Sequence, residues 1–168
     1  MPDDRIPISG YEQDFDIWTQ AQANALREAG AAMARGAIPT VTALEWENLA
    51  EEIESLGRRD RRELGNRLAV IIEHLVKREA SQHAEPKAGW TRTIRRERRS
   101  IATILRESPS LRRLVPSLIS EHLDFAVEDA VGALAEHGEH GEHPDIAARR
   151  AVPYTPAEIL GDWLPASP

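Results

Sequence analysis

Six carboxylate and imidazole side chains have the chemistry of a metal site, because helical bundles bind divalent ions with carboxylates and histidines that point inward. Three glutamates recur at steps of four and three, which places them on one side of a helix. A later histidine and an aspartate lie seven residues apart, again on one helix face. The six residues are Glu47, Glu51, Glu54, His74, His122 and Asp129. They predict a divalent-metal site and, as one alternative function, a metal-dependent helical-bundle enzyme.

The same residues also have a structural interpretation, which we prefer. The sequence contains no Glu-x-x-His pair, the spacing that gives di-metal bundles two ligands from one helix turn. We therefore expect the glutamates to pair with arginines of the following helices, and His74 and His122 to be hydrogen-bonded within the protein. His137, His140 and His143 recur every three residues in a glycine-containing segment that predicts an exposed loop. We accordingly expect no cofactor.

Basic residues are concentrated in the middle of the chain. Residues 58–113 carry 16 Lys and Arg against 7 Asp and Glu, although the net charge of the whole chain is −7. Four arginines lie on the polar face of one predicted helix, at Arg92, Arg95, Arg96 and Arg99. They could neutralise phosphates, so a nucleic-acid-associated protein is a second alternative. The acidic flanks and the pI of about 5.4 argue against it, because nucleic-acid-binding domains are typically basic.

Several classes of protein are excluded by what the sequence lacks. It has no cysteine, so disulfides, thiolate zinc sites and cysteine nucleophiles are excluded, and a reducing compartment is expected. No export signal and no apolar run of about 20 residues occurs, so we expect a soluble cytoplasmic protein without a membrane partner. No Walker loop, Gly-x-Ser-x-Gly or His-Glu-x-x-His motif occurs, so we do not expect an enzyme.

Capping signals mark the ends of the first predicted helices. Residues 9–12 have capping-box spacing and predict a helix that ends at Gly36. Residues 42–45 repeat the signal for a second helix that ends at Gly57, and a third helix is predicted over residues 60–80.

Prolines and glycines divide the second half of the chain. A fourth helix is predicted from Trp90 and a fifth from Ser108-Pro109, with Pro116 kinking the fifth helix or resetting its start. Residues 137–152 begin without an apolar period and predict an exposed loop. A capping signal at residues 155–158 predicts a short C-terminal helix.

The predicted fold is all-α: a bundle of about five main helices plus the short C-terminal helix. We expect one domain, residues 1–168, with a flexible N-terminus over residues 1–8, because this length suffices for a single core. The predicted core consists of apolar residues at helical spacing, namely Trp18, Trp46, Leu49, Ile53, Leu68, Ile71, Leu75, Ile94, Ile101, Leu118 and Phe125.

The segment Trp46–Arg58, Trp-Glu-Asn-Leu-Ala-Glu-Glu-Ile-Glu-Ser-Leu-Gly-Arg, resembles the family called domain of unknown function 29, which is found mainly in bacteria. The resemblance covers nearly the whole chain and implies a helical domain. It implies no activity for any residue. Supporting matches lie at Tyr11, Asp14, Phe15, Trp18, Gln22, Arg61, Glu63, Leu64, His74, Trp90, Ser108-Pro109-Ser110-Leu111-Arg112 and Pro153-Tyr154-Thr155.

We therefore predict a small helical interaction or accessory protein. Its partner is either an unidentified protein or a second copy of the chain. Charged helical faces without catalytic motifs favour this interpretation over the nucleic-acid and metal-enzyme alternatives.

Overall fold

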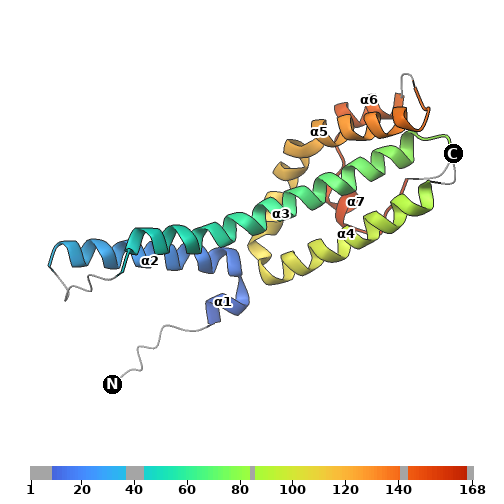
Figure 1. Cartoon of the computed structure of the whole chain (residues 1–168). Helices are drawn as coiled ribbons and strands as arrows, with labels where there is room; N and C mark the ends of the chain where they lie inside the picture. Colours follow the sequence, from blue (N-terminus) through green and yellow to red (C-terminus); the bar gives the residue numbers. More distant parts are fainter. Residues whose placement is uncertain (1–8, 37–43, 84–85, 141–143, 166–168) are drawn as a thin grey trace. The chain divides into compact units, whose positions relative to one another are not determined.

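The computed structural model describes residues 9–36, 44–83, 86–140 and 144–165, and over these ranges the chain is all-α, as predicted (Figure 1). No strand occurs in them, and none of their helices combines the length and apolarity needed to cross a membrane. The predicted flexible N-terminus lies outside the described residues. In chain order the helices are α1 (Ser9–Gln13), α2 (Phe15–Ala34), α3 (Trp46–Ala80), α4 (Lys87–Glu107), the 3-10 helix η1 (Pro109–Leu114), α5 (Val115–Glu136), α6 (Pro144–Ala151) and α7 (Pro156–Leu160).

The chain divides into two compact units, each described here by itself. Unit 1 comprises Met1–Arg62 with Leu105–Leu111, and unit 2 comprises Glu63–Ile104 with Arg112–Pro168. Helices α3 and α4 and the 3-10 helix η1 each contribute residues to both units. Whether the chain behaves as one domain, as the sequence predicts, stays a prediction.

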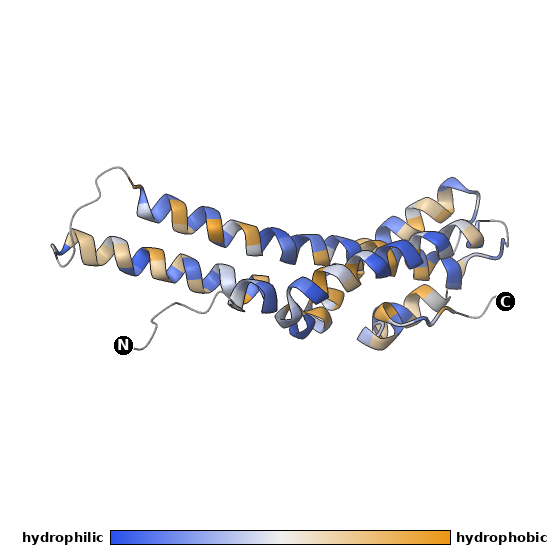
Figure 2. Cartoon of the chain, turned by 90° about the horizontal axis from the view of Figure 1, so that it is seen from below, coloured by the Kyte–Doolittle hydropathy of each residue, from blue (hydrophilic) through white to orange (hydrophobic). Residues whose placement is uncertain are grey.

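Unit 2 contains most of the large buried side chains. Apolar residues at helical spacing follow one stripe along each long helix, which Figure 2 shows as orange bands among blue polar residues. A buried leucine or isoleucine stabilises a fold by about 1.5–3 kcal/mol, so this stripe dominates the stability of the unit. Its buried members include Leu64, Leu68, Ile71, Ile72, Leu75 and Val76 of α3, Ile94 and Ile101 of α4, and Val115, Ile119, Leu123, Val127 and Leu134 of α5.

Unit 1 is built on a pair of helices, α2 and the first part of α3, which lie side by side (Figures 1 and 2). Small residues allow the two backbones to approach closely. A Cβ atom at Gly30 would lie 2.8 Å from Cβ of Trp46, and one at Gly57 would lie 2.5 Å from Oγ1 of Thr19. Thr19 near the start of α2 meets Gly57, whereas Gly30 near the end of α2 meets Trp46 at the start of α3, so the two helices run antiparallel.

Two predicted helix boundaries in this unit are wrong. The first helix does not run unbroken from residue 9, because Asp14 interrupts it and caps α2 by accepting a hydrogen bond from the Ile17 N–H at 3.0 Å. The predicted end at Gly57 is absent, and α3 continues through it to Ala80. Glycine is common after helix ends, but here it serves the close contact with Thr19. The capping signal at residues 42–45 lies partly outside the described residues.

Boundaries in the second half follow the predictions more closely. Pro116 resets the fifth helix: a 3-10 turn precedes it and α5 begins at Val115, with the proline in the first turn. The capping box at Thr155 is confirmed, since its side chain accepts a hydrogen bond from the Glu158 N–H. The segment 137–152 is not wholly a loop, because α6 occupies Pro144–Ala151 and buries Ile146.

The predicted core is right for the second part of α3 and for α4, but part of it is wrong on the first part of α3 and on α5. Leu68, Ile71 and Ile94 are fully buried. Phe125 is 70 % exposed and Leu49 is 40 % exposed. The reset at the start of α5 explains the first error, because it turns a different stripe inward, through Ile119, Leu123, Val127 and Leu134.

A matched pair of glycine substitutions tests the close approach of α2 and α3. We expect Gly57→Ala to lower the free energy of unfolding by about 1–2 kcal/mol, because its methyl group overlaps the β-branched side chain of Thr19. Gly132→Ala, where nothing lies within 4 Å of an added Cβ in α5, should raise it by about 0.5–1 kcal/mol. Urea unfolding of the full chain measures both, and a stabilising Gly57→Ala would contradict the packing.

Candidate functional site

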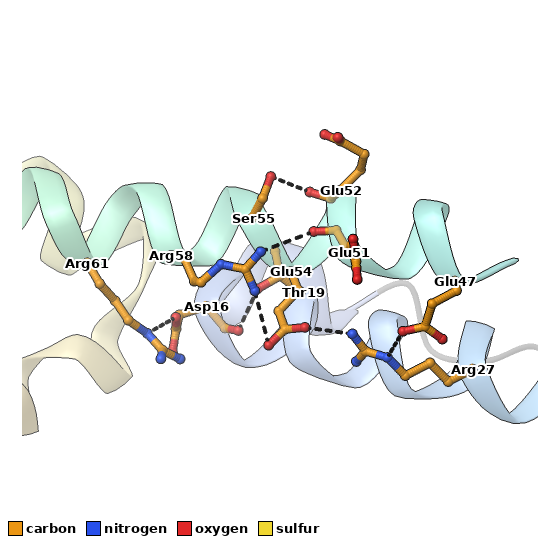
Figure 3. Close-up of polar contacts among 10 residues, drawn as sticks. All are labelled: Asp16, Thr19, Arg27, Glu47, Glu51, Glu52, Glu54, Ser55, Arg58 and Arg61. Atoms are coloured by element: carbon orange, nitrogen blue, oxygen red, sulfur yellow. Dashed lines mark hydrogen bonds and ion pairs between the residues drawn. The ribbon is translucent and has the colours of Figure 1, made fainter. Parts of the chain in front are cut away.

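The three glutamates predicted as metal ligands lie beside an arginine of α2, and two of them form ion pairs with it (Figure 3). The Arg27 guanidinium lies between two of the three glutamates: Nε is 2.9 Å from Oε1 of Glu47, and Nη2 is 2.8 Å from Oε2 of Glu54. Arg58, one turn along α3, adds a contact of 3.3 Å to Glu54. Glu51 is exposed, and its backbone carbonyl accepts a hydrogen bond from Arg58 at 3.5 Å.

The partner of these glutamates therefore differs from the one predicted. We expected arginines of the later, basic helices, whereas the cross-helix partner is Arg27, from the acidic N-terminal part of the chain. The reason is the antiparallel register, which places the middle of α2 beside the start of α3. The hydrogen bond from Arg27 lowers the pKa of Glu54 and raises the pKa of Arg27, so both groups stay charged at neutral pH.

Asp16, a buried carboxylate that was not predicted from the sequence, lies close to Glu54 and Arg58 (Figure 3). Asp16 in the first turn of α2 is 1 % exposed, and its two oxygens accept hydrogen bonds from Nε and Nη2 of Arg61 at 2.8 and 3.0 Å. Its backbone N–H donates to Oγ of Ser108 at 3.2 Å, and its carbonyl accepts from Thr19. An acidic residue in a first helix turn is usually a surface charge near the helix dipole, so burial of Asp16 could not be predicted from its position.

Asp14, two residues before Asp16, also contacts a residue that is distant in the sequence, Ser110. Its carboxylate accepts hydrogen bonds from both the backbone N–H and the hydroxyl of Ser110, the latter at 2.8 Å. The start of α2 is thus tied to the turn between α4 and η1 by Asp14 and Asp16 together. Both serines of the segment Ser108-Pro109-Ser110 thus make hydrogen bonds to the start of α2.

The two predicted histidines have structural contacts in unit 2. Nδ1 of His74 lies 2.9 Å from the carbonyl oxygen of Val70, in agreement with the hydrogen bond within the protein that we expected for this residue. Burial, and to a lesser degree the charge of Lys77, lowers the pKa of His74. The His122 ring lies against Gly65, where an added Cβ would be 2.5 Å from Nε2.

Asp129 is exposed and His122 is half-buried, so these two residues do not both point inward as the predicted metal site requires. Among the described residues, no three His, Asp or Glu side chains come together as a metal-binding group. The six predicted ligands are therefore not gathered into one cluster.

The arginines of α4 and its neighbours divide into internal and surface groups. Arg98 donates to the carbonyls of Glu158, Ile159 and Trp163 at 2.7–2.8 Å, holding the end of α7, and its burial lowers its pKa. Arg67 binds the buried carboxylate of Glu97 at 2.6 Å. These guanidinium groups belong to the fold and are not available to a partner.

The four arginines predicted for nucleic acid, Arg92, Arg95, Arg96 and Arg99, are exposed. Their steps of three, one and three place them on one face of α4, opposite the buried Ile94 and Ile101. Arg96 pairs with Glu97 at 2.8 Å, whereas no carboxylate in the described ranges pairs with the other three. We call these four residues the arginine face. It presents four exposed cations on one face of a single helix.

Comparison with known proteins gives a family and a fold. The family model described as "Domain of unknown function DUF29" matches residues 10–164. A crystal structure of an alpha-helical protein of unknown function from Rhodospirillum rubrum is similar in fold, with a TM-score of 0.69 and 24 % identity over 90 % of this chain and 89 % of that one. No curated protein matches the sequence.

Removing Arg61 tests the contribution of the Asp16–Arg61 ion pair to stability. Arg61→Ala leaves the Asp16 carboxylate buried without its cation, so we expect the free energy of unfolding to fall by on the order of 3 kcal/mol, the low end for broken buried pairs because Arg61 is partly exposed. Arg59→Ala, at an exposed arginine two residues earlier on α3, is the matched control and should change it by less than about 0.5 kcal/mol. Equal effects of the two substitutions in urea unfolding would contradict a stabilising role for the Asp16–Arg61 pair.

The lowered pKa of His74 predicts a pH dependence. The unfolded chain, with an ordinary histidine pKa of about 6.5, takes up the proton before the folded protein does. The contribution of His74 to stability is thus fully present above that pH and is lost as the pH falls below it. We expect His74→Gln to flatten the stability profile between about pH 7 and 5. The exposed His140→Gln is the control, and NMR titration showing a His74 pKa at or above the ordinary value would contradict this.

Proposed function

The chain belongs to the DUF29 family, and we propose that it is an interaction module that binds an acidic surface of a partner protein through the arginine face of α4. The observation that supports this most directly is the exposure of Arg92, Arg95, Arg96 and Arg99 on a single helix face. Exposed arginines at helical spacing present forked donors that suit carboxylates and are enriched at interfaces.

A protein partner is favoured over nucleic acid by the charge of the chain. The net charge of −7 repels an extended polyanion, which would run past the ends of one helix face. A discrete acidic patch on a protein meets only the arginine face. We further propose a cytoplasmic and bacterial setting, which the lack of cysteine and the Rhodospirillum rubrum structure support.

The test compares two triple variants of equal net charge. Arg92→Ala/Arg95→Ala/Arg99→Ala removes the members of the arginine face without an internal pair and keeps Arg96 on Glu97. The control removes three exposed arginines elsewhere, Arg59, Arg62 and Arg113. With poly-L-glutamate as the acidic probe, the first variant should bind about tenfold more weakly than wild type, from about 0.5 kcal/mol per exposed pair, and the control should not.

Affinity purification from the native host then identifies the partner. Proteins recovered with wild type and with the control, but not with the arginine-face variant, are the expected result. If both variants recover the same proteins and bind the probe equally, the arginine face is not the binding surface.

Nucleic acid is the second candidate, favoured by the same four exposed arginines. Its signature is the salt dependence of binding to duplex DNA, where each lost phosphate contact lowers the slope of log K against log salt by about 1. DNA binding that is tighter than poly-L-glutamate binding and loses slope in the arginine-face variant would replace the protein-partner proposal.

A further inference from the structure

Helix α5 in unit 2 presents carboxylates to solvent around an exposed aromatic ring. Phe125 is 70 % exposed and lies on the side of the helix opposite to the buried Leu123 and Leu134. Four exposed carboxylates lie within four residues of it along the helix and share this side. Aromatic side chains are enriched where proteins bind one another, so this side is a candidate docking surface. We call its five residues the acidic face: Glu121, Asp124, Phe125, Glu128 and Asp129.

The acidic face repeats the spacing of the arginine face of α4. Steps of three, one and three join Glu121, Asp124, Phe125 and Glu128 in α5, and they join Arg92, Arg95, Arg96 and Arg99 in α4. Each set therefore covers the same angular width of its helix and about 10 Å of its length, at about 1.5 Å per residue. When two such faces pack against each other in either direction, each arginine lies opposite a carboxylate or opposite the ring of Phe125, which can make a cation–π contact.

The two faces do not meet within one molecule. Each points away from the buried residues of its own helix, and α4 and α5 lie on opposite sides of α3 in unit 2 (Figure 1). Among the described residues, which include the whole of both helices, no ion pair joins the arginine face to the acidic face. A contact between the two faces therefore requires two molecules.

We propose that the partner of the arginine face is the acidic face of a second copy of this chain, so that α4 of one molecule packs on α5 of another. This inference rests on the proposed function and names its partner. Charge complementarity supports it, because four arginines on one molecule match four carboxylates on the other. The exposed ring of Phe125 adds an aromatic centre to the contact, against which the apolar stems of the arginines can pack.

We expect the association to be weak and to depend on protein concentration. One pair of helix faces buries less than the roughly 800 Å² per partner of a standard interface, and a dissociation constant on the order of 100 µM suits that size. A two-fold dimer would form the same contact twice, with each molecule contributing both faces. Sedimentation velocity of the full chain, over concentrations on both sides of the expected constant, measures it.

Charge reversal on each face tests the contact. Arg92→Glu/Arg95→Glu/Arg99→Glu reverses the arginine face and keeps Arg96 on Glu97. Glu121→Lys/Asp124→Lys/Glu128→Lys reverses the acidic face. Each variant alone should associate at least about tenfold more weakly than wild type, because like charges then face each other. All six residues are exposed, so both variants should keep the circular dichroism spectrum of wild type.

An equimolar mixture of the two reversed variants separates pairing from a general effect of charge. The glutamates on α4 of the first variant then face the lysines on α5 of the second, and the unchanged arginine face of the second faces the unchanged acidic face of the first. Association in the mixture should return to about wild-type strength. A folded pair of variants that fails to associate, or a wild type that stays monomeric over the whole concentration range, overturns the proposal.

Matched controls carry the same net charge at other exposed positions. They are Arg59→Glu/Arg62→Glu/Arg113→Glu and Glu12→Lys/Glu28→Lys/Glu52→Lys, and both should associate as wild type does. Phe125→Ala leaves the charge unchanged and should weaken association about two- to fivefold. Equal weakening by the controls and by the reversed faces would contradict the assignment to α4 and α5.

Failure of this inference is distinct from failure of the proposed function. A wild type that is monomeric but binds poly-L-glutamate through the arginine face overturns the second copy as partner and leaves the binding surface in place. An acidic-face variant that associates as strongly as wild type, while the arginine-face variant does not, likewise overturns the role of α5. Loss of neither association nor probe binding in the arginine-face variant overturns both.

Discussion

Unit 1 depends on the burial of one carboxylate, that of Asp16. A carboxylate that is 1 % exposed must be compensated by hydrogen bonds and an opposite charge, and in this fold Arg61 supplies both. Arg61 of α3 donates two hydrogen bonds to the carboxylate. The hydroxyl oxygen of Ser108, in the turn after α4, accepts a hydrogen bond from the backbone N–H of Asp16. A buried ion pair adds little net stability over an apolar substitute. We infer that its role is to select this crossing of three segments over competing apolar packings.

The rest of unit 1 follows from that crossing. Once Asp16 and Arg61 are joined, the antiparallel register brings Thr19 to Gly57 and Arg27 between Glu47 and Glu54. The interface is thus specified by polar pairs and close backbone approach. Unit 2 works differently, because its α3 residues from Leu64 onward bury a continuous apolar stripe. Helix α3 therefore takes part in two kinds of packing. Its sequence changes from mostly charged residues to an apolar stripe near the boundary between the two units, which lies between Arg62 and Glu63.

Sequence reasoning succeeded where one signal has one meaning. The apolar period through Leu68 and Ile71 could only be a buried helix face, and the Thr155 capping box could only start a helix. It failed where a signal has two meanings. Gly57 had the appearance of a helix end but serves a close contact, and Asp16 had the appearance of a surface charge but is buried. The partner Arg27 could not be predicted, because it depends on a register that no local pattern encodes.

The basic middle of the chain contributes both to internal contacts and to the surface. Counted along the sequence, residues 58–113 offer enough cations to follow a nucleic-acid backbone. In the fold, Arg61, Arg67 and Arg98 are not available to a nucleic acid, because each is bound to internal carboxylates or carbonyls. What one helix presents to solvent is the smaller arginine face. A surface of that size complements a local acidic patch better than a continuous line of phosphates, so the internal use of arginine itself favours a protein partner.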